Sequence, residues 1–124
     1  MSVAVLHHGD YLIASIQSDL SDSEVLRFRD DLVKRVGERR ARGLIVDVSA
    51  LDVIDSFVAR ALRSVAVTVR LRGAETVVVG IRPDVAIALV QFDLNLDPIR
   101  AALDLDEGVA LLDRLTERDG HNGV

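Results

Sequence analysis

The chain contains no cysteine and only three histidines, His7, His8 and His121. The absence of cysteine excludes disulfide bonds, thiolate metal sites and cysteine nucleophiles. Three histidines leave little room for a histidine metal site. His7 and His8 are adjacent, so in a strand they would point to opposite faces. We expect them to flank a turn between two strands rather than to bind a metal.

An excess of basic residues and a long apolar run are also missing. Fifteen Lys and Arg stand against 20 Asp and Glu, a formal net charge of −5. General nucleic-acid binding instead requires a basic surface that displaces counterions. No apolar run reaches the ~20 residues of a membrane span, and the first residues have no basic segment typical of a signal peptide. We therefore expect a cytoplasmic protein that binds neither nucleic acid nor membrane.

The apolar content that is present suits one α/β domain. Hydrophobic residues make up 49% of the 124 residues, enough for one buried core. We expect a domain over residues 1–118 and a disordered tail at 119–124. The order β, β, α, β, α, β, α, α predicts a mixed four- to five-stranded sheet packed against about four helices. The expected strands are 3–6, 11–16, 44–48 and 76–79, and the expected helices begin near residues 22, 56, 83 and 106.

The first expected helix has the clearest signals. Ser21 and Glu24 have the spacing of a capping box. Basic residues after position 38 oppose the negative pole of the helix, and Gly43 suits its end. One apolar face is formed by Val25, Phe28, Leu32 and Val36.

Common enzyme motifs are absent from the chain. No dinucleotide-binding glycine pattern follows a strand, and there is no phosphate-binding P-loop. There is also no G-x-S-x-G elbow. Ser56 has Asp55 beside it, but no histidine lies nearby in sequence. We therefore expect no catalytic residues, no cofactor and no enzyme activity.

Three carboxylates cluster around the third strand and the loop after it: Asp47, Asp52 and Asp55. They could bind a divalent cation, as in phospho-aspartate receivers. We favour a structural interpretation, in which Asp47 and Asp52 stabilise a turn and Asp55 caps the next helix.

Ser56 follows the expected cap at the start of the second helix. The first N–H groups of a helix lack partners and carry the positive end of its dipole, so that end tolerates a phosphate. Arg60, four residues on, can also reach such a group. Val53, Ile54 and Phe57 would frame the serine with apolar surface suited to a partner. From the residues alone, a plain serine at a helix start remains the alternative.

The segment from Gly43 to Phe57, GLIVDVSALDVIDSF, resembles the core signature of STAS domains, the anti-sigma factor antagonists. That family has the same strand, short acidic loop and Asp-Ser pair at a helix start. Gly73-Ala74 and GIRPDVA from Gly80 also look family-like. The resemblance extends from about Val3 to Leu115 and implies a STAS fold.

Within the family, the chain resembles the small RsbS-like scaffolds of stressosomes. Phe57 and Val58 follow the Asp-Ser pair where simple sporulation-type antagonists usually have a small hydroxyl residue and a glycine. This subgroup implies a switch: RsbR-like STAS paralogues join the assembly, and an RsbT-like serine/threonine kinase is held there. Phosphorylation of Ser56 by that kinase would release it and so regulate a stress-response or sigma-factor pathway.

We expect Ser56 to lie inside the kinase-binding surface, with Ile54, Asp55, Phe57 and Arg60 as the residues that contact the kinase. The resemblance also implies homo- and hetero-oligomers. A second phosphate acceptor of some relatives is a threonine before the glycine of the G-I-x-P turn, where this chain has Val79. A direct anti-anti-sigma factor that captures an anti-sigma kinase is the alternative function. A STAS subunit of a transporter is less favoured.

Overall fold

A five-stranded sheet lies at the centre of the computed structural model, which describes residues 3–122, with side chains to residue 117. The elements in chain order are β1 Val3–His8, β2 Tyr11–Ile16, α1 Asp22–Arg39, β3 Gly43–Asp47, α2 Ser56–Arg70, β4 Glu75–Val79, α3 Pro83–Gln91, β5 Arg100–Ala102 and α4 Leu105–Asn122. The strands lie side by side in sequence order; β1 is antiparallel to β2, and the other pairs are parallel. The predicted α/β class and mixed sheet are confirmed.

The first two strands form the predicted hairpin. Gly9 and Asp10 make its two-residue turn, and Gly9 has a φ of 59°, which glycine adopts without strain. β1 runs two residues further than expected, so His7 and His8 are its exposed last residues.

The first helix has the predicted capping box. The Glu24 N–H donates to Ser21 Oγ at 3.3 Å, and the Ser21 N–H donates to Glu24 Oε1 at 3.0 Å. Its buried residues are the four predicted ones. The helix ends earlier than Gly43, however: Arg40 is the left-handed C-cap, with a φ of 50°.

Gly43 has a different role from the predicted helix stop, because it is the first residue of β3. A Cβ at Gly43 would lie 2.8 Å from Leu112 Cδ1 and 2.9 Å from Tyr11 Cδ1. Gly108 likewise lets α4 approach the sheet, since its Cβ would lie 2.7 Å from Val79 Cγ1. Both glycines therefore permit close packing of α4 on the sheet.

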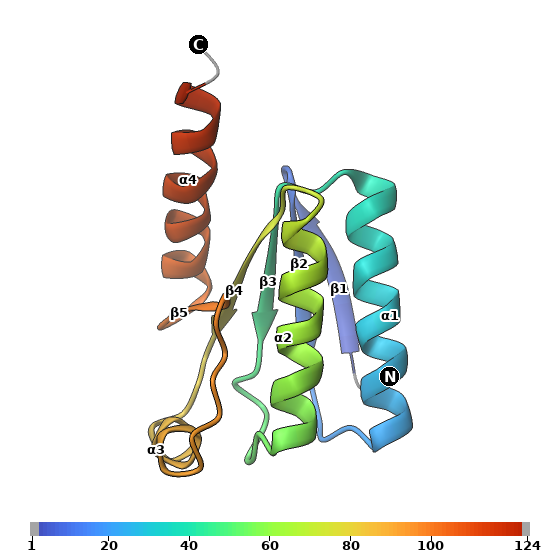
Figure 1. Cartoon of the computed structure of the whole chain (residues 1–124), viewed down its shortest axis with the longest axis vertical. Coiled ribbons are helices and arrows are strands. Elements are labelled where there is room, and N and C mark those ends of the chain that lie inside the picture. The colour runs from blue at the N-terminus through green and yellow to red at the C-terminus, as the bar shows by residue number, and fades with distance from the viewer. Residues whose placement is uncertain (1–2, 123–124) are drawn as a thin grey trace.

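The two faces of the sheet are covered unequally. α1 and α2 lie next to each other over one face, and α4 packs against β3, β4 and β5 (Figure 1). Alternation along β3 shows that α4 is on the other face, because Leu44 and Val46 belong to the core under α1 and α2, whereas Ile45 packs with Leu112 of α4. No helix within residues 3–122 combines the length and apolar character needed to cross a bilayer.

Partly buried hydrogen bonds hold α4 to the edge of its core. The Tyr11 hydroxyl donates to Asp113 Oδ1 at 2.6 Å and lies 3.0 Å from Thr116 Oγ1. Arg42 donates to the Thr116 carbonyl at 2.9 Å. Burial, and then the bond to Asp113, raise the pKa of Tyr11 above its ordinary value.

The fifth strand was not among the elements predicted one by one. β5 has only three residues and begins with an arginine, so it lacks a readable alternation, and its pairing with β4 defines it. The predicted tail at 119–124 overlaps the end of α4, whose backbone continues to Asn122. The last two residues of that tail lie outside the described residues.

The topology gathers three helix starts at one edge of the sheet. β2, β3 and β4 are parallel, so their carboxyl ends lie together, and α1, α2 and α3 begin after them. Ligands and partners of α/β proteins commonly bind at this edge. It is also the edge where Ser56 lies.

Candidate functional site

The loop between β3 and α2 is anchored at two points. Leu51 and Ile54 are each only 4% exposed and belong to the core under α1 and α2. Val53, between them, is 66% exposed. Ile54 is therefore not part of the apolar border expected around Ser56, because its side chain is used to fix the loop. Val53 and the half-buried Phe57 supply that border instead.

Asp55 is the N-cap of α2, as predicted. Its Oδ1 accepts from the Val58 N–H at 2.9 Å, and its carbonyl accepts from the Ala59 N–H at 2.9 Å. Ser56 follows as the first helical residue and is exposed. Since the aspartate performs the capping, the Ser56 hydroxyl makes no hydrogen bond to another described residue. The structure thus presents a free hydroxyl at the positive end of α2.

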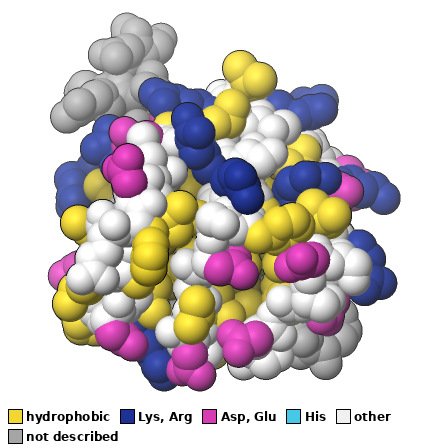
Figure 2. Space-filling view, turned by 60° about the horizontal axis from the view of Figure 1, so that its bottom comes forward, with side chains coloured by type: hydrophobic (Ala, Val, Ile, Leu, Met, Phe, Trp, Pro, Cys, Tyr) yellow, Lys and Arg dark blue, Asp and Glu magenta, His cyan; other side chains and the backbone are white. Residues whose placement is uncertain are grey.

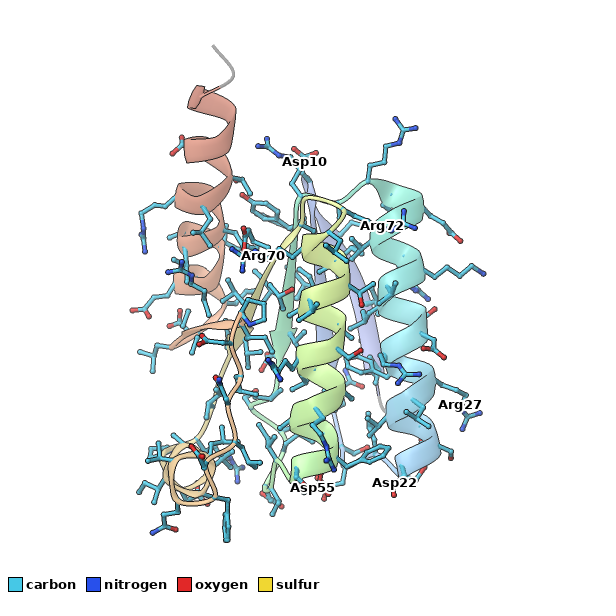
Figure 3. All side chains as sticks on the ribbon, viewed as in Figure 1. Asp10, Asp22, Arg27, Asp55, Arg70 and Arg72 are labelled. Carbon is cyan, nitrogen blue, oxygen red and sulfur yellow. The ribbon has the colours of Figure 1, made fainter. Side chains whose placement is uncertain are left out.

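Arg60 lies one turn further along α2 and is also exposed. The i to i+4 spacing puts it on the same side of the helix as Ser56. The structure therefore places Asp55, Ser56, Phe57 and Arg60 together at the start of α2. Asp55 marks this helix start in Figure 3.

The three clustered carboxylates have separate roles. Asp47 Oδ1 accepts from the Ser49 N–H at 2.9 Å, which is the predicted turn contact. Asp52 does not stabilise a turn as predicted; its Oδ1 pairs instead with Arg82 Nη1 at 2.6 Å. No group of three or more His, Cys, Asp or Glu side chains suited to a metal ion occurs among the described residues.

Arg82 is a site residue that sequence reasoning missed. It is the N-cap of α3, 30 positions from Asp52, and it joins the loop before α3 to the loop before α2. The GIRP turn resembles a family pattern. However, no local sequence pattern predicts that Arg82 pairs with Asp52, which lies 30 positions away.

Gly80 allows the same two loops to touch. Its φ is 80°, and a Cβ there would lie 2.7 Å from Ser49 Cβ and 3.0 Å from Asp47 Oδ1. The Val48 N–H also donates to the Val79 carbonyl at 3.0 Å. Val79 has no hydroxyl group and is only 1% exposed. The second phosphate acceptor that some relatives have at this position is therefore missing here.

Other hydroxyl groups differ from Ser56 in accessibility or in their bonds. Ser21 caps α1, and its Oγ lies 3.3 Å from Ser23 Oγ. Thr76 is 4% exposed and has an unpaired Oγ1 among the described atoms. Ser64 is exposed but lies in the middle of α2, away from the helix start.

His7 and His8 lie far from Ser56 along the sheet. His8 pairs with Tyr11 at the start of β2, whereas Val3 pairs with Ile16 at its end. Ser56 lies at the end of the parallel strands, where Ile16 is found. Neither histidine is therefore placed to take a proton from Ser56.

Carboxylates lie at the helix starts along one end of the sheet. Four carboxylates lie in or beside the first turns of the helices that begin at this edge: Asp22, Glu24, Asp55 and Asp84. Negative charges there are stabilised by the positive ends of the helix dipoles. Figure 2 shows acidic side chains interspersed with apolar ones over this end. Asp22 and Asp55 lie there, while Arg70 and Arg72 lie at the opposite end (Figure 3).

This arrangement is that of a STAS domain. A short acidic loop after a buried parallel strand leads into an Asp-capped helix that begins with serine. The family model described as "STAS domain" matches residues 2–107. The chain belongs to the STAS domain family, as the sequence predicted.

Within that family, the chain is similar to RsbS. A serine-to-glutamate variant of RsbS from Moorella thermoacetica is 34% identical, with a TM-score of 0.81 over 94% of this chain and 99% of that one. A chain from the structure of the stressosome, described as a signal integration and transduction hub, is 32% identical, with a TM-score of 0.73 over 91% of this chain and 98% of that one.

Curated relatives of greater length match in part. The RsbT co-antagonist protein RsbRA of Bacillus subtilis is 27% identical over 92 residues, which are 74% of this chain and 34% of RsbRA. The chain thus spans about a third of the length of that relative.

Proposed function

We propose that the protein is a phosphorylation-controlled stressosome scaffold. In this proposal it holds an RsbT-like serine/threonine kinase and releases it when Ser56 is phosphorylated, thereby regulating a stress-response or sigma-factor pathway. The observation that carries the proposal is the exposed Ser56 hydroxyl at the start of α2, left free because Asp55 performs the capping.

The relatives support the choice of partners. RsbS and a stressosome chain are similar to this chain over nearly its whole length. RsbRA is named as an RsbT co-antagonist protein. By analogy, this chain assembles with RsbR-like STAS paralogues, forms homo- and hetero-oligomers, and antagonises an RsbT-like kinase.

The position of Ser56 fits a switch that changes a surface and preserves the fold. A phosphoserine adds a charge of about −1.5 to −2 at neutral pH. At the first turn of α2 this charge faces free N–H groups and the positive pole of the helix, and Arg60 is within reach. The same charge lies next to Asp55, so the surface seen by a partner becomes strongly acidic.

In this proposal the protein catalyses no reaction, and its Ser56 hydroxyl is the acceptor of a phosphate that the kinase transfers. Ser56 has neither His7 nor His8 near it. The kinase supplies the catalytic groups, and the scaffold supplies the acceptor hydroxyl.

The first experiment reconstitutes the protein with its cognate RsbT-like kinase and RsbR-like paralogue. Without ATP, the kinase should co-elute with a large particle; with ATP, it should be released as phosphate appears on Ser56. Ser56→Ala should retain the kinase in both conditions, and Ser64→Ala, an exposed serine on the same helix, serves as the matched control. Release from Ser56→Ala at the wild-type rate would contradict the proposal.

The same experiment separates the alternative function. A direct anti-anti-sigma factor would form a small stoichiometric complex with an anti-sigma kinase. A particle of megadalton size supports the scaffold, whereas a small complex alone supports the antagonist. Native mass spectrometry distinguishes the two directly.

A further inference from the structure

A hollow of about 140 Å³ opens beside the start of α2. It lies between α1 and α2, under the loops that precede them. Its apolar walls include Ile16, Leu20, Phe28, Leu51, Val58 and Leu62. Three further lining residues are exposed, namely Asp19, Val53 and Asp55.

The size of this hollow suits one apolar side chain. An apolar cavity of about 150 Å³ in another protein stays dry and accepts benzene. A single leucine, isoleucine or phenylalanine side chain from a partner would therefore fill the hollow. Val53, which is 66% exposed, would add apolar contact at its opening.

The charges around the hollow indicate which residues would flank that side chain in the partner. Both charged residues in the lining, Asp19 and Asp55, are acidic. Asp55 caps α2, while Asp19 makes no hydrogen bond or ion pair within the described part of the chain. Asp52 is already paired with Arg82. The edge of the hollow is therefore complementary to a basic segment.

We propose that this hollow, named here the α1–α2 hollow, receives one apolar side chain of the kinase, flanked in the kinase by Lys or Arg residues. This inference rests on the proposed function, because it assigns the occupant of the surface next to Ser56. Asp55 both caps α2 and lines the hollow, and Val58 lies two residues after Ser56. A phosphate on Ser56 would thus be added at the edge of the seated side chain.

The geometry gives this anchor a role in release. A seated apolar side chain excludes water from the hollow, and a phosphate beside it must keep its own hydration. A hydrated phosphate at the edge of the hollow would therefore unseat the apolar side chain, and this loss must outweigh the attraction of the phosphate for the flanking basic residues.

The test fills the hollow from within. Val58→Phe places a ring where the partner side chain would lie, and Val67→Phe makes the same change at a 44% exposed position of the same helix. In calorimetric titration with unphosphorylated protein, Val58→Phe should weaken kinase binding at least about tenfold, the worth of one buried apolar side chain. Val67→Phe should bind as wild type does, and the melting temperature of Val58→Phe should equal or exceed that of wild type.

A second variant avoids any change of packing. Asp19→Asn should weaken binding about twofold to fivefold and reduce its dependence on salt, as expected of a charge at the rim of an interface. Asp10→Asn is the control, because Asp10 lies in the hairpin turn at the other end of the sheet (Figure 3). If Val58→Phe and Asp19→Asn, both folded, bind the kinase as tightly as wild type, the inference is wrong while the proposed function stands.

A peptide titration tests whether the hollow binds an apolar side chain in the absence of the kinase. We would titrate the protein with an Arg-Leu-Arg peptide and with Arg-Ala-Arg, observing valine and leucine methyl groups by NMR. The leucine peptide should shift Leu20, Val53, Val58 and Leu62 more than the alanine peptide does. If the kinase fails to bind wild type, the proposed function is overturned; equal shifts with both peptides would overturn the hollow as an anchor site.

Discussion

α1 and α2 begin at the same edge of the sheet, and each has a serine at its start, but the two serines are used differently. Ser21 is itself the N-cap of α1, and its hydroxyl accepts from the Glu24 N–H. In α2 the cap is Asp55, and Ser56 is one position further on. The second serine is therefore free of a structural bond, while the first is not.

This difference explains why one helix start is suited to modification. A phosphate on Ser21 would disrupt the capping box, which depends on the Ser21 hydroxyl as the acceptor of the Glu24 N–H. A phosphate on Ser56 would leave the Asp55 cap in place and would face unpaired N–H groups. Separation of the capping residue from the acceptor residue thus allows a charge to be added without loss of the helix.

The largest expected effect concerns phosphorylation. With the cognate kinase and ATP, Ser56→Ala should lose essentially all incorporated phosphate, whereas Ser21→Ala should incorporate it as wild type does. The reason is that, among the serines and threonines that the structure describes, Ser56 alone combines exposure, a free hydroxyl and the start of a helix. Phosphopeptide mapping by mass spectrometry measures this, and most label on Ser21 or Ser23 would contradict the comparison.

The next effect concerns the cap of α2. Asp55→Ala removes the acceptor of the Val58 N–H and should cost about 1 kcal/mol, within a range of about 0.5–2 kcal/mol. A loss of that size corresponds to a fall of about 3–6 °C in melting temperature for a domain of this length. Asp55→Asn, which retains a good capping residue, should recover most of the loss. Calorimetric melting curves of the three proteins decide the matter, and no loss in Asp55→Ala would show that the cap does not stabilise α2.

A direct comparison of the two serines gives a smaller difference. Ser21→Ala breaks a capping box and should also cost about 1 kcal/mol. Ser56→Ala should change the free energy of unfolding by less than about 0.5 kcal/mol, as expected of an exposed substitution that breaks no bond. Urea denaturation of the two variants measures both values. Equal losses would mean that the Ser56 hydroxyl has a structural role.

The smallest effect is a pH dependence confined to α1. Hydrogen bonds from Ser21 lower the pKa of Glu24 below its ordinary value of 4.5. Because the folded pKa is lowered, the stabilisation is present above the unfolded value and is lost as pH falls through the folded pKa. The difference in melting temperature between wild type and Glu24→Gln should therefore be constant above pH 4.5 and shrink below it. A difference that grows on acidification would contradict this sign.

Much of this molecule follows from local pattern in the sequence. The capping box of α1, its four buried residues and the Asp55 cap were all predicted, because each depends on residues within one or two helical turns. Ser56 could be singled out for the same reason, and the STAS signature around it is also continuous in sequence.

The errors lie where distant segments meet. Ile54 looks like surface in a short loop, but the loop turns into the core under α1 and α2. Asp52 looks like a turn residue until Arg82, 30 positions away, is placed beside it. β5 is recognised only because it pairs with β4.

The sequence by itself determined the helix starts, the position of Ser56 directly after its capping residue, and the family. Only the tertiary structure decided which loop residues face the solvent, which carboxylate is paired, and that α1 and α2 enclose a hollow beside Ser56. The physical reason is that capping and periodicity are satisfied by neighbours along the chain. Burial and pairing across loops depend instead on parallel strands that bring the ends of separate segments to one edge.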